Sequence, residues 1–221
     1  MVWRPQDHRR HSRHIIAKEE TKMKRLRTIL CSGLLLLIVS GCASINYNEI
    51  APNANTFQPK VAVVLPAIKM PEGTEQDIDK VAKAIFDAAV ATKRFGRVID
   101  PMTAKSQMSD NGDLQSAVMT YTNKLRSLAV SDKDNALKIG EILQADTIIV
   151  GEVSKWGYGI YAGEKNGEVG MAIKMVDVAT GAIYWKAAHA AKETYSLFKP
   201  DLTDMATKLA KKIFEYMPKP K

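Results

Sequence analysis

Cys42 has the most specific chemical setting of any residue in this 221-residue chain. It closes the segment VSGC (residues 39–42), which follows an apolar run over residues 29–39 and a basic stretch over residues 24–27. A thiol placed after small residues at the end of such a run is typical of the cleavage box of a bacterial lipoprotein. We therefore predict cleavage between Gly41 and Cys42, followed by attachment of palmitate-like acyl chains to the Cys42 thiol.

The apolar run has about half of the ~20 residues that a membrane-spanning helix needs, which favours a signal peptide. The alternative to a signal peptide is that this run forms a short core helix and that Cys42 is an ordinary buried thiol. A signal that begins at Met23 would cover residues 23–41, an ordinary length. Residues 1–22 have no apolar periodicity, and we interpret them as an upstream extension without a structural role. The sequence leaves open whether translation starts at Met1 or Met23.

Removal of the signal changes the charge of the chain. The whole sequence carries a net charge of +8, but residues 1–41 hold nine of its 32 Lys and Arg and three of its 24 Asp and Glu. The remainder keeps 23 basic and 21 acidic residues, a net charge of +2. A domain with so small a net charge gives no indication of a nucleic-acid partner.

Few residues of the remainder could form a catalytic or metal site. His189 is its only histidine, which excludes a zinc site with several histidines. A Ser-His-Asp set lacks the G-x-S-x-G turn, so a structural histidine is the expected role. Four glutamates could supply a carboxylate pair for glycoside chemistry, although nothing in their spacing fixes such a pair: Glu152, Glu164, Glu168 and Glu193. We expect no catalytic residues, no metal, and no cofactor other than the lipid on Cys42.

A glycine-rich aromatic segment is the second candidate site. Residues 157–163 read GYGIYAG, which misses the G-x-G-x-x-G spacing and precedes a strand pattern, so a phosphate site is not expected. The amphipathic rings of Trp156, Tyr158 and Tyr161 suit a protein interface or the lipid headgroup layer. The alternative is a plain flexible hairpin tip that continues through Gly167.

The elements that must position these residues follow from apolar periodicity. Strands are expected where β-branched or alternating apolar residues recur: residues 61–67, 146–156, 169–177 and 182–195, with a further short strand within residues 95–101. Helices are expected where apolar residues recur every three or four positions: residues 78–89, 101–108, 114–128, 134–144 and 201–217. Residues 109–113 (SDNGD) have the composition of a loop.

These elements predict an α/β fold with three layers. We expect a mixed sheet of four to five strands, a C-terminal antiparallel hairpin and a C-terminal helix packed on the sheet. Residues 61–217 would form this single domain. Residues 42–60 lack periodicity and are rich in Asn and Pro, which predicts a lipidated N-terminus and a flexible tether.

Several segments, taken in order, resemble one known group of proteins. The lipidation box, VAVVLPA, FGRVIDP, ALKIGEILQADTIIVGEV and IKMVDVATGAIYW are similar to the curli-secretion-channel (CsgG-like) superfamily of periplasmic lipoproteins over roughly residues 61–216. The closest branches are activators of penicillin-binding proteins and small uncharacterised lipoproteins. The resemblance implies a periplasmic α/β domain that acts by assembly or contact rather than by catalysis.

The expected function is that of an outer-membrane lipoprotein on the periplasmic face, since Ala43, and not Asp, follows the lipidated cysteine. We expect a non-catalytic accessory or scaffold in envelope assembly, export or peptidoglycan synthesis. The lipid would hold it to the membrane, and its protein partner is not identified by the sequence. Two alternatives remain: a homo-oligomeric ring at the membrane, and an enzyme that acts on envelope polymers.

Overall fold

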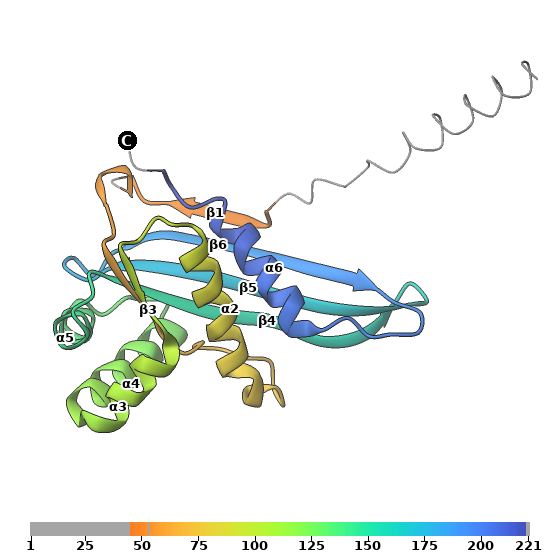
Figure 1. Cartoon of the computed structure of the whole chain (residues 1–221), viewed down its shortest axis with the longest axis horizontal. Coiled ribbons are helices and arrows are strands. Elements are labelled where there is room, and N and C mark those ends of the chain that lie inside the picture. Colours follow the sequence, from red (N-terminus) through yellow and green to blue (C-terminus); the bar gives the residue numbers. More distant parts are fainter. Residues whose placement is uncertain (1–44, 53, 220–221) are drawn as a thin grey trace, which may run out of the picture. The chain divides into compact units, whose positions relative to one another are not determined.

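The computed structural model describes residues 45–219 except residue 53. The upstream extension, the signal peptide, Gly41 and Cys42 lie outside the described residues. Within the described part, one mixed sheet of six strands carries helices on both of its faces (Figure 1). The three-layer α/β prediction is confirmed, with one or two strands more than expected.

The sheet has the strand order β1-β6-β5-β4-β2-β3. Its strands are β1 (Tyr47–Ile50), β2 (Val61–Val64), β3 (Arg97–Ile99), β4 (Thr147–Tyr161), β5 (Glu164–Asp177) and β6 (Ile183–Thr194). β4, β5, β6 and β1 pair in antiparallel fashion, whereas β2 is parallel to both β4 and β3. The β5–β6 pair is the predicted C-terminal hairpin.

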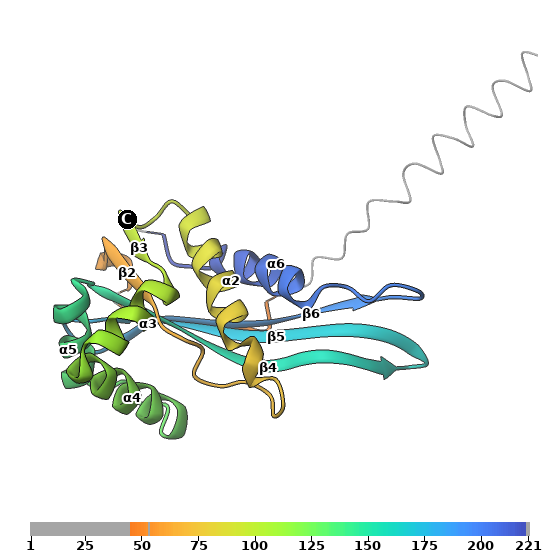
Figure 2. The ribbon, with the colours of Figure 1, turned by 60° about the horizontal axis from the view of Figure 1, so that its bottom comes forward.

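Two helical layers cover the sheet. The helices are α2 (Ile78–Ala91), α3 (Pro101–Asp110), α4 (Gly112–Ser127), α5 (Lys133–Leu143) and α6 (Leu202–Phe214). Figure 2 shows α2 and α6 on one side of the sheet, with α4 and α5 on the other. Short 3-10 turns, η2 (Ala54–Thr56) and η3 (Glu75–Asp77), precede β2 and α2.

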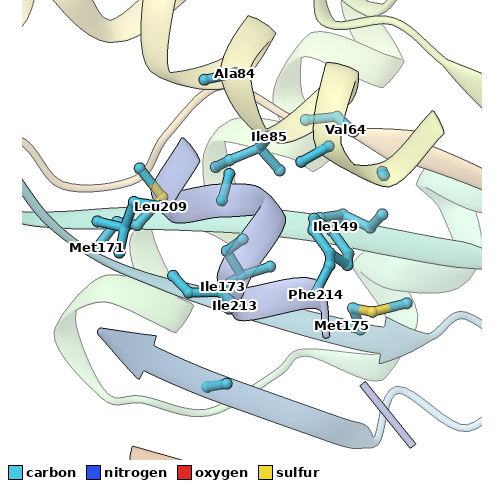
Figure 3. Packing of buried hydrophobic residues seen from close by; sticks show 14 of the residues in the cluster. Val64, Ala84, Ile85, Ile149, Met171, Ile173, Met175, Leu209, Ile213 and Phe214 are labelled. Carbon is cyan, nitrogen blue, oxygen red and sulfur yellow. The ribbon is translucent and has the colours of Figure 1, made fainter. Parts of the chain in front are cut away.

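The larger core cluster lies between the sheet and the pair α2 and α6. Figure 3 shows Ile85 of α2 and Leu209, Ile213 and Phe214 of α6 close to apolar side chains of the central strands. Gly151 of β4 makes room for this packing, because a Cβ there would lie 2.4 Å from Ile85 Cδ1. A second cluster fills the space between the other face and the helices α3, α4 and α5.

The prediction that residues 42–60 form a flexible tether is wrong for β1. Tyr47–Ile50 pairs with residues 185–188 of β6, so the sheet already begins within the segment assigned to the tether. Trp185 Nε1 donates to Asn48 Oδ1 across 2.9 Å, and Lys186 Nζ lies 2.9 Å from Glu49 Oε2. The segment NYNEI shows no apolar alternation, so its own sequence does not indicate a strand. Its strand conformation depends on pairing with β6.

The β4–β5 hairpin is longer than the sequence pattern predicts. Both strands continue past residue 156, and only Ala162 and Gly163 stand between them. Strand pairing joins Trp156 to Val169 and Tyr158 to Gly167 within the segment expected to be a flexible tip. Residues 157–161 and 164–167 are therefore strand residues.

Candidate functional site

The chain enters the domain at β1, the first strand after the predicted lipid site in the sequence. Tyr47 lies opposite Ala188 of β6, and Ile50 lies opposite Trp185, so β1 runs against β6. Followed backward from Tyr47, the chain heads toward the C-terminal end of β6, and Asn46 contacts His189. Tyr47 follows Cys42 by five positions in the sequence, which limits the distance between the two residues to about 17 Å in a fully extended chain.

None of the helices within the described residues has the length and apolar content needed to cross a membrane.

The second candidate site lies where the long strands end. We call this region the distal end and define it as residues 156–168 of the β4–β5 hairpin together with residues 195–201 between β6 and α6. Figures 1 and 2 show these two segments extending past the helices at the same end of the sheet. The distal end contains Trp156, Tyr158 and Tyr161, the three residues predicted as an interface.

Trp156 is held within the fold. Its indole nitrogen donates to Asp77 Oδ2 across 2.9 Å, and its ring packs, partly buried, against the larger core cluster. Lys80 Nζ lies 2.6 Å from the other carboxylate oxygen of Asp77. The hydrogen bond from Lys80 lowers the pKa of Asp77 most; burial opposes it, and the hydrogen bond from Trp156 lowers the pKa by a smaller amount than burial raises it. Trp156 therefore positions the hairpin and offers little surface to a partner.

Tyr158 connects the two segments of the distal end. Its hydroxyl donates to the carbonyl oxygen of Pro200 across 2.7 Å, and its ring meets that of Tyr195 edge to face at 5.9 Å. Burial, followed by the charge of Asp201 and the nearby Tyr195 hydroxyl, raises the pKa of Tyr158. The Tyr158 side chain thus fixes the β6–α6 connection to the hairpin.

Tyr161 is the predicted interface residue most available for contact. It is 69% exposed, and Lys192 Nζ lies 4.0 Å from the centre of its ring. The structure adds three exposed apolar residues at the same end that the sequence analysis missed: Ile160 at 74%, Leu197 at 85% and Phe198 at 87%. The sequence could have indicated Leu197 and Phe198, because these two large apolar residues lie between a predicted strand and a predicted helix and belong to neither.

Charged residues of both signs surround these apolar side chains. Lys199 Nζ lies 4.7 Å from the centre of the Tyr158 ring. Glu168 accepts from Lys155 at 3.1 Å, and Glu193 lies 3.9 Å from Lys208. Two of the acidic side chains near the distal end are therefore neutralised by lysines of the sheet and of α6.

The residues considered for catalysis are dispersed over the sheet. Glu152 forms an ion pair with Lys174, and strand pairing sets Glu164 opposite Tyr161 at the hairpin turn. His189 is buried, and its Nδ1 contacts Asn46 Oδ1. Burial, followed by the charge of Lys212, lowers the pKa of His189. Among the described residues, no group of three or more His, Cys, Asp or Glu side chains could hold a metal ion.

Comparisons with known proteins give weak structural likenesses. No family model and no curated protein matches the sequence. Lipoprotein GNA1162 from Neisseria meningitidis is 16% identical with a TM-score of 0.48, over 68% of this chain and 94% of that one. The PelC dodecamer from Paraburkholderia phytofirmans is 14% identical with a TM-score of 0.46, over 79% and 97%. The LpoB C-terminal domain from Escherichia coli is 11% identical with a TM-score of 0.35, over 62% and 86%.

Proposed function

We propose that this chain is an outer-membrane lipoprotein, held to the periplasmic face by acyl chains on Cys42. Its proposed role is that of a non-catalytic accessory or scaffold in envelope assembly, export or peptidoglycan synthesis. The observation that carries the proposal is the lipidation box, which stands five positions before the first strand of a domain with several exposed apolar side chains at its distal end, among them Leu197 and Phe198. Such exposed groups are typical of contact surfaces.

The placement of the titratable groups supports contact over catalysis. A carboxylate pair for glycoside chemistry needs two acids that face one bond from opposite sides. Here Glu152, Glu168 and Glu193 each lie within ion-pair distance of a lysine. His189 contacts Asn46 and is covered by its surroundings.

Membership in the CsgG-like superfamily is part of the proposal. Its support is the placement of the two segments with the most specific resemblance. DTIIVGEV forms the inner half of β4, and VDVATGAIYW spans the end of β5, the turn and the start of β6. These segments build the centre of the sheet, so they bear on architecture more than on function.

The first test is chemical. Cells that express the chain are fed an alkyne analogue of palmitate, and the protein is examined for label, for mass at its N-terminus and for its membrane fraction. We expect label and outer-membrane fractionation for the wild type, and loss of both for Cys42→Ala. Retention of Cys42→Ala in the membrane fraction would contradict the anchor.

The second test separates contact from catalysis. In a deletion strain with a measurable envelope defect, Cys42→Ala is expected to fail to restore function. Glu152→Gln, Glu168→Gln and Glu193→Gln are expected to restore it, because they remove acids without altering the anchor. Loss of function in one of these, with unchanged circular dichroism, would favour an enzyme that acts on envelope polymers.

A ring-forming oligomer remains the second candidate because one strand edge is open. β4 pairs with β2 through residues 147–149 and meets Lys69 at Glu152. Beyond Val153, the described residues place no strand beside this edge of β4. Such an edge can pair with another chain. Light scattering of the detergent-solubilised lipoprotein tests this, and a strictly monomeric mass would count against a ring.

A further inference from the structure

We infer that the distal end rests on the phospholipid headgroup layer of the membrane that holds the lipid anchor. Tyr161, Ile160, Leu197 and Phe198 would enter the headgroup region, with lysines beside them. The domain would then stand with its long strands directed toward the membrane and its helices farther away. This inference depends on the proposed anchor at Cys42 and adds an orientation and a second, non-covalent contact to it.

The direction of β1 and the length of chain before it allow the anchor to reach this end. From Ala188, opposite Tyr47, to the end of β6 at Thr194 is six residues, or about 20 Å of strand. The five residues from Tyr47 back to Cys42 span at most about 17 Å and start toward the same end. The covalent chain therefore allows the acyl chains and the distal end to meet one membrane surface.

The side chains of the distal end match the chemistry of such a surface. Leu197 and Phe198 are adjacent and almost fully exposed, on a loop that joins two regular elements. Large apolar side chains insert favourably about 5–10 Å into the boundary between headgroups and acyl chains. Tyr158 and Tyr161 carry both an apolar ring and a hydroxyl, the combination found at the interfaces of membranes.

Lysines at and beside the distal end can contact lipid phosphates. Lys165, Lys192 and Lys199 surround the exposed apolar residues, and among the described residues neither Lys165 nor Lys199 has an acidic group within 4.0 Å. Glu164 at the hairpin turn, Glu168 and Asp201 are the opposing charges within the distal end, and Glu168 also lies 3.9 Å from Lys192. Lysines beside a membrane extend their stems over apolar surface and place the ammonium among phosphates, each contributing about 1 kcal/mol at an anionic surface.

The two segments are fixed to each other, so they present one surface. Tyr158 donates to the Pro200 carbonyl, and Pro200 packs so closely on Gly167 that a Cβ there would lie 2.6 Å from Pro200 Cγ. The hairpin and the β6–α6 loop are thus joined at Pro200, two residues after Phe198. A preorganised surface loses little conformational entropy when it binds.

A spin-label experiment tests the orientation. The only cysteines of the chain are Cys31, in the predicted signal, and Cys42, so a third cysteine provides the one free thiol of the lipoprotein. Ser196→Cys places a nitroxide beside Leu197, and Ser127→Cys places one beside Leu128, a similarly exposed leucine after α4. The mature lipoproteins are reconstituted into vesicles of phosphatidylethanolamine with a minority of phosphatidylglycerol. Collision rates with dissolved oxygen and with an aqueous nickel chelate then report depth.

We expect the label at Ser196 to be several-fold less accessible to the chelate and more accessible to oxygen than the label at Ser127. Replacement of Leu197 and Phe198 by Asp should return the label at Ser196 to water while the protein stays in the vesicles. The matched change, Leu128→Asp with Val130→Asp, should have no effect on it. Equal chelate accessibility at the two sites would overturn the inference.

The lipid anchor and the orientation of the domain are tested by separate measurements. The mass of the N-terminal peptide reports lipidation before any label is read. Acyl mass together with a label at Ser196 that stays in water would refute the orientation alone. An N-terminus without acyl chains would refute the proposed function and this inference with it.

Discussion

The indole nitrogen of Trp156 donates a hydrogen bond of 2.9 Å to Asp77 Oδ2, joining β4 to the turn that starts α2. Asp77 stands at the N-cap position of α2, yet its side chain makes no capping hydrogen bond. Its carboxylate instead serves Trp156 and Lys80. The connection lies where β4 leaves the cover of the helices, so it fixes the direction in which the hairpin projects.

Trp156→Phe should lower the free energy of unfolding by about 1–3 kcal/mol, because it removes the N–H donor to a charged acceptor together with part of the ring that packs on the core. Urea unfolding measures the change. When Asp77 is already replaced by Asn, Trp156→Phe should lower the free energy of unfolding by a clearly smaller amount, since the charged acceptor is absent. Equal costs in the two backgrounds would show that the hydrogen bond contributes nothing.

Two glycines of the distal end should respond differently to a methyl group. A Cβ at Gly167 would lie 2.6 Å from Pro200 Cγ, whereas a Cβ at Gly159 meets nothing within 4 Å. Gly167→Ala should therefore destabilise the domain by about 1–3 kcal/mol, as overpacking does. Gly159→Ala should change stability by less than about 0.5 kcal/mol. Urea titrations of the two variants check this, and similar effects would contradict the close packing of Pro200.

Most of the fold could be predicted because its inner elements are locally consistent. The β-branched run after Lys60 and the segment DTIIVGEV each form strands buried in the sheet, and α6 buries its predicted stripe. The segment SDNGD was wrongly expected to be a loop. Asn111 instead caps α4, accepting from the Leu114 N–H, and α3 extends to Asp110.

The site was predicted less well because its strands depend on distant partners. Gly157, Gly159 and Gly163 favour turns locally, but cross-strand pairing extends β4 to Tyr161. Of the three aromatic residues predicted as an interface, Trp156 packs into the fold. Leu197 and Phe198 were missed because exposure of an apolar pair depends on what the rest of the chain leaves uncovered.

Asp132 should stabilise α5 in a way that acid removes. It accepts from the Asn135 N–H at 3.0 Å, and its contact with Lys124, followed by that backbone hydrogen bond, lowers its pKa to about 2. Loss of such an N-cap in Asp132→Ala should cost about 1 kcal/mol at neutral pH. Because the folded-state pKa is depressed, the charge-dependent part is present above about pH 4 and is lost as the pH falls toward 2.

Asp132→Asn is the matched control, since Asn caps helices about as well as Asp and carries no charge. It should retain most of the stability at neutral pH and lose less than the wild type in acid. Urea midpoints at a series of pH values measure both variants. An Asn variant with the full acid dependence of the wild type would assign that dependence to other carboxylates.

His189 should make the domain less stable as the pH falls below neutrality. Burial, followed by the charge of Lys212, lowers its folded-state pKa below the ordinary 6.5, so the unfolded chain binds the proton more readily. The free energy of unfolding is therefore highest above pH 6.5 and decreases as the pH falls from 6.5 toward the depressed pKa. The other three histidines lie within residues 1–14, so the chain from Cys42 onward reports His189 alone.

His189→Gln tests the assignment, because Gln keeps a polar group near Asn46 and does not titrate. Its urea midpoint should be nearly flat between pH 7.5 and 5.5, where that of the wild type declines. The contact between His189 and Asn46 lies at the residue just before β1, so the same titration should loosen the first strand. Amide hydrogen exchange of residues 47–50 should accelerate in the wild type as the pH falls, beyond the intrinsic pH dependence of exchange. A wild type and a His189→Gln variant with parallel pH profiles would show that His189 contributes nothing to this dependence.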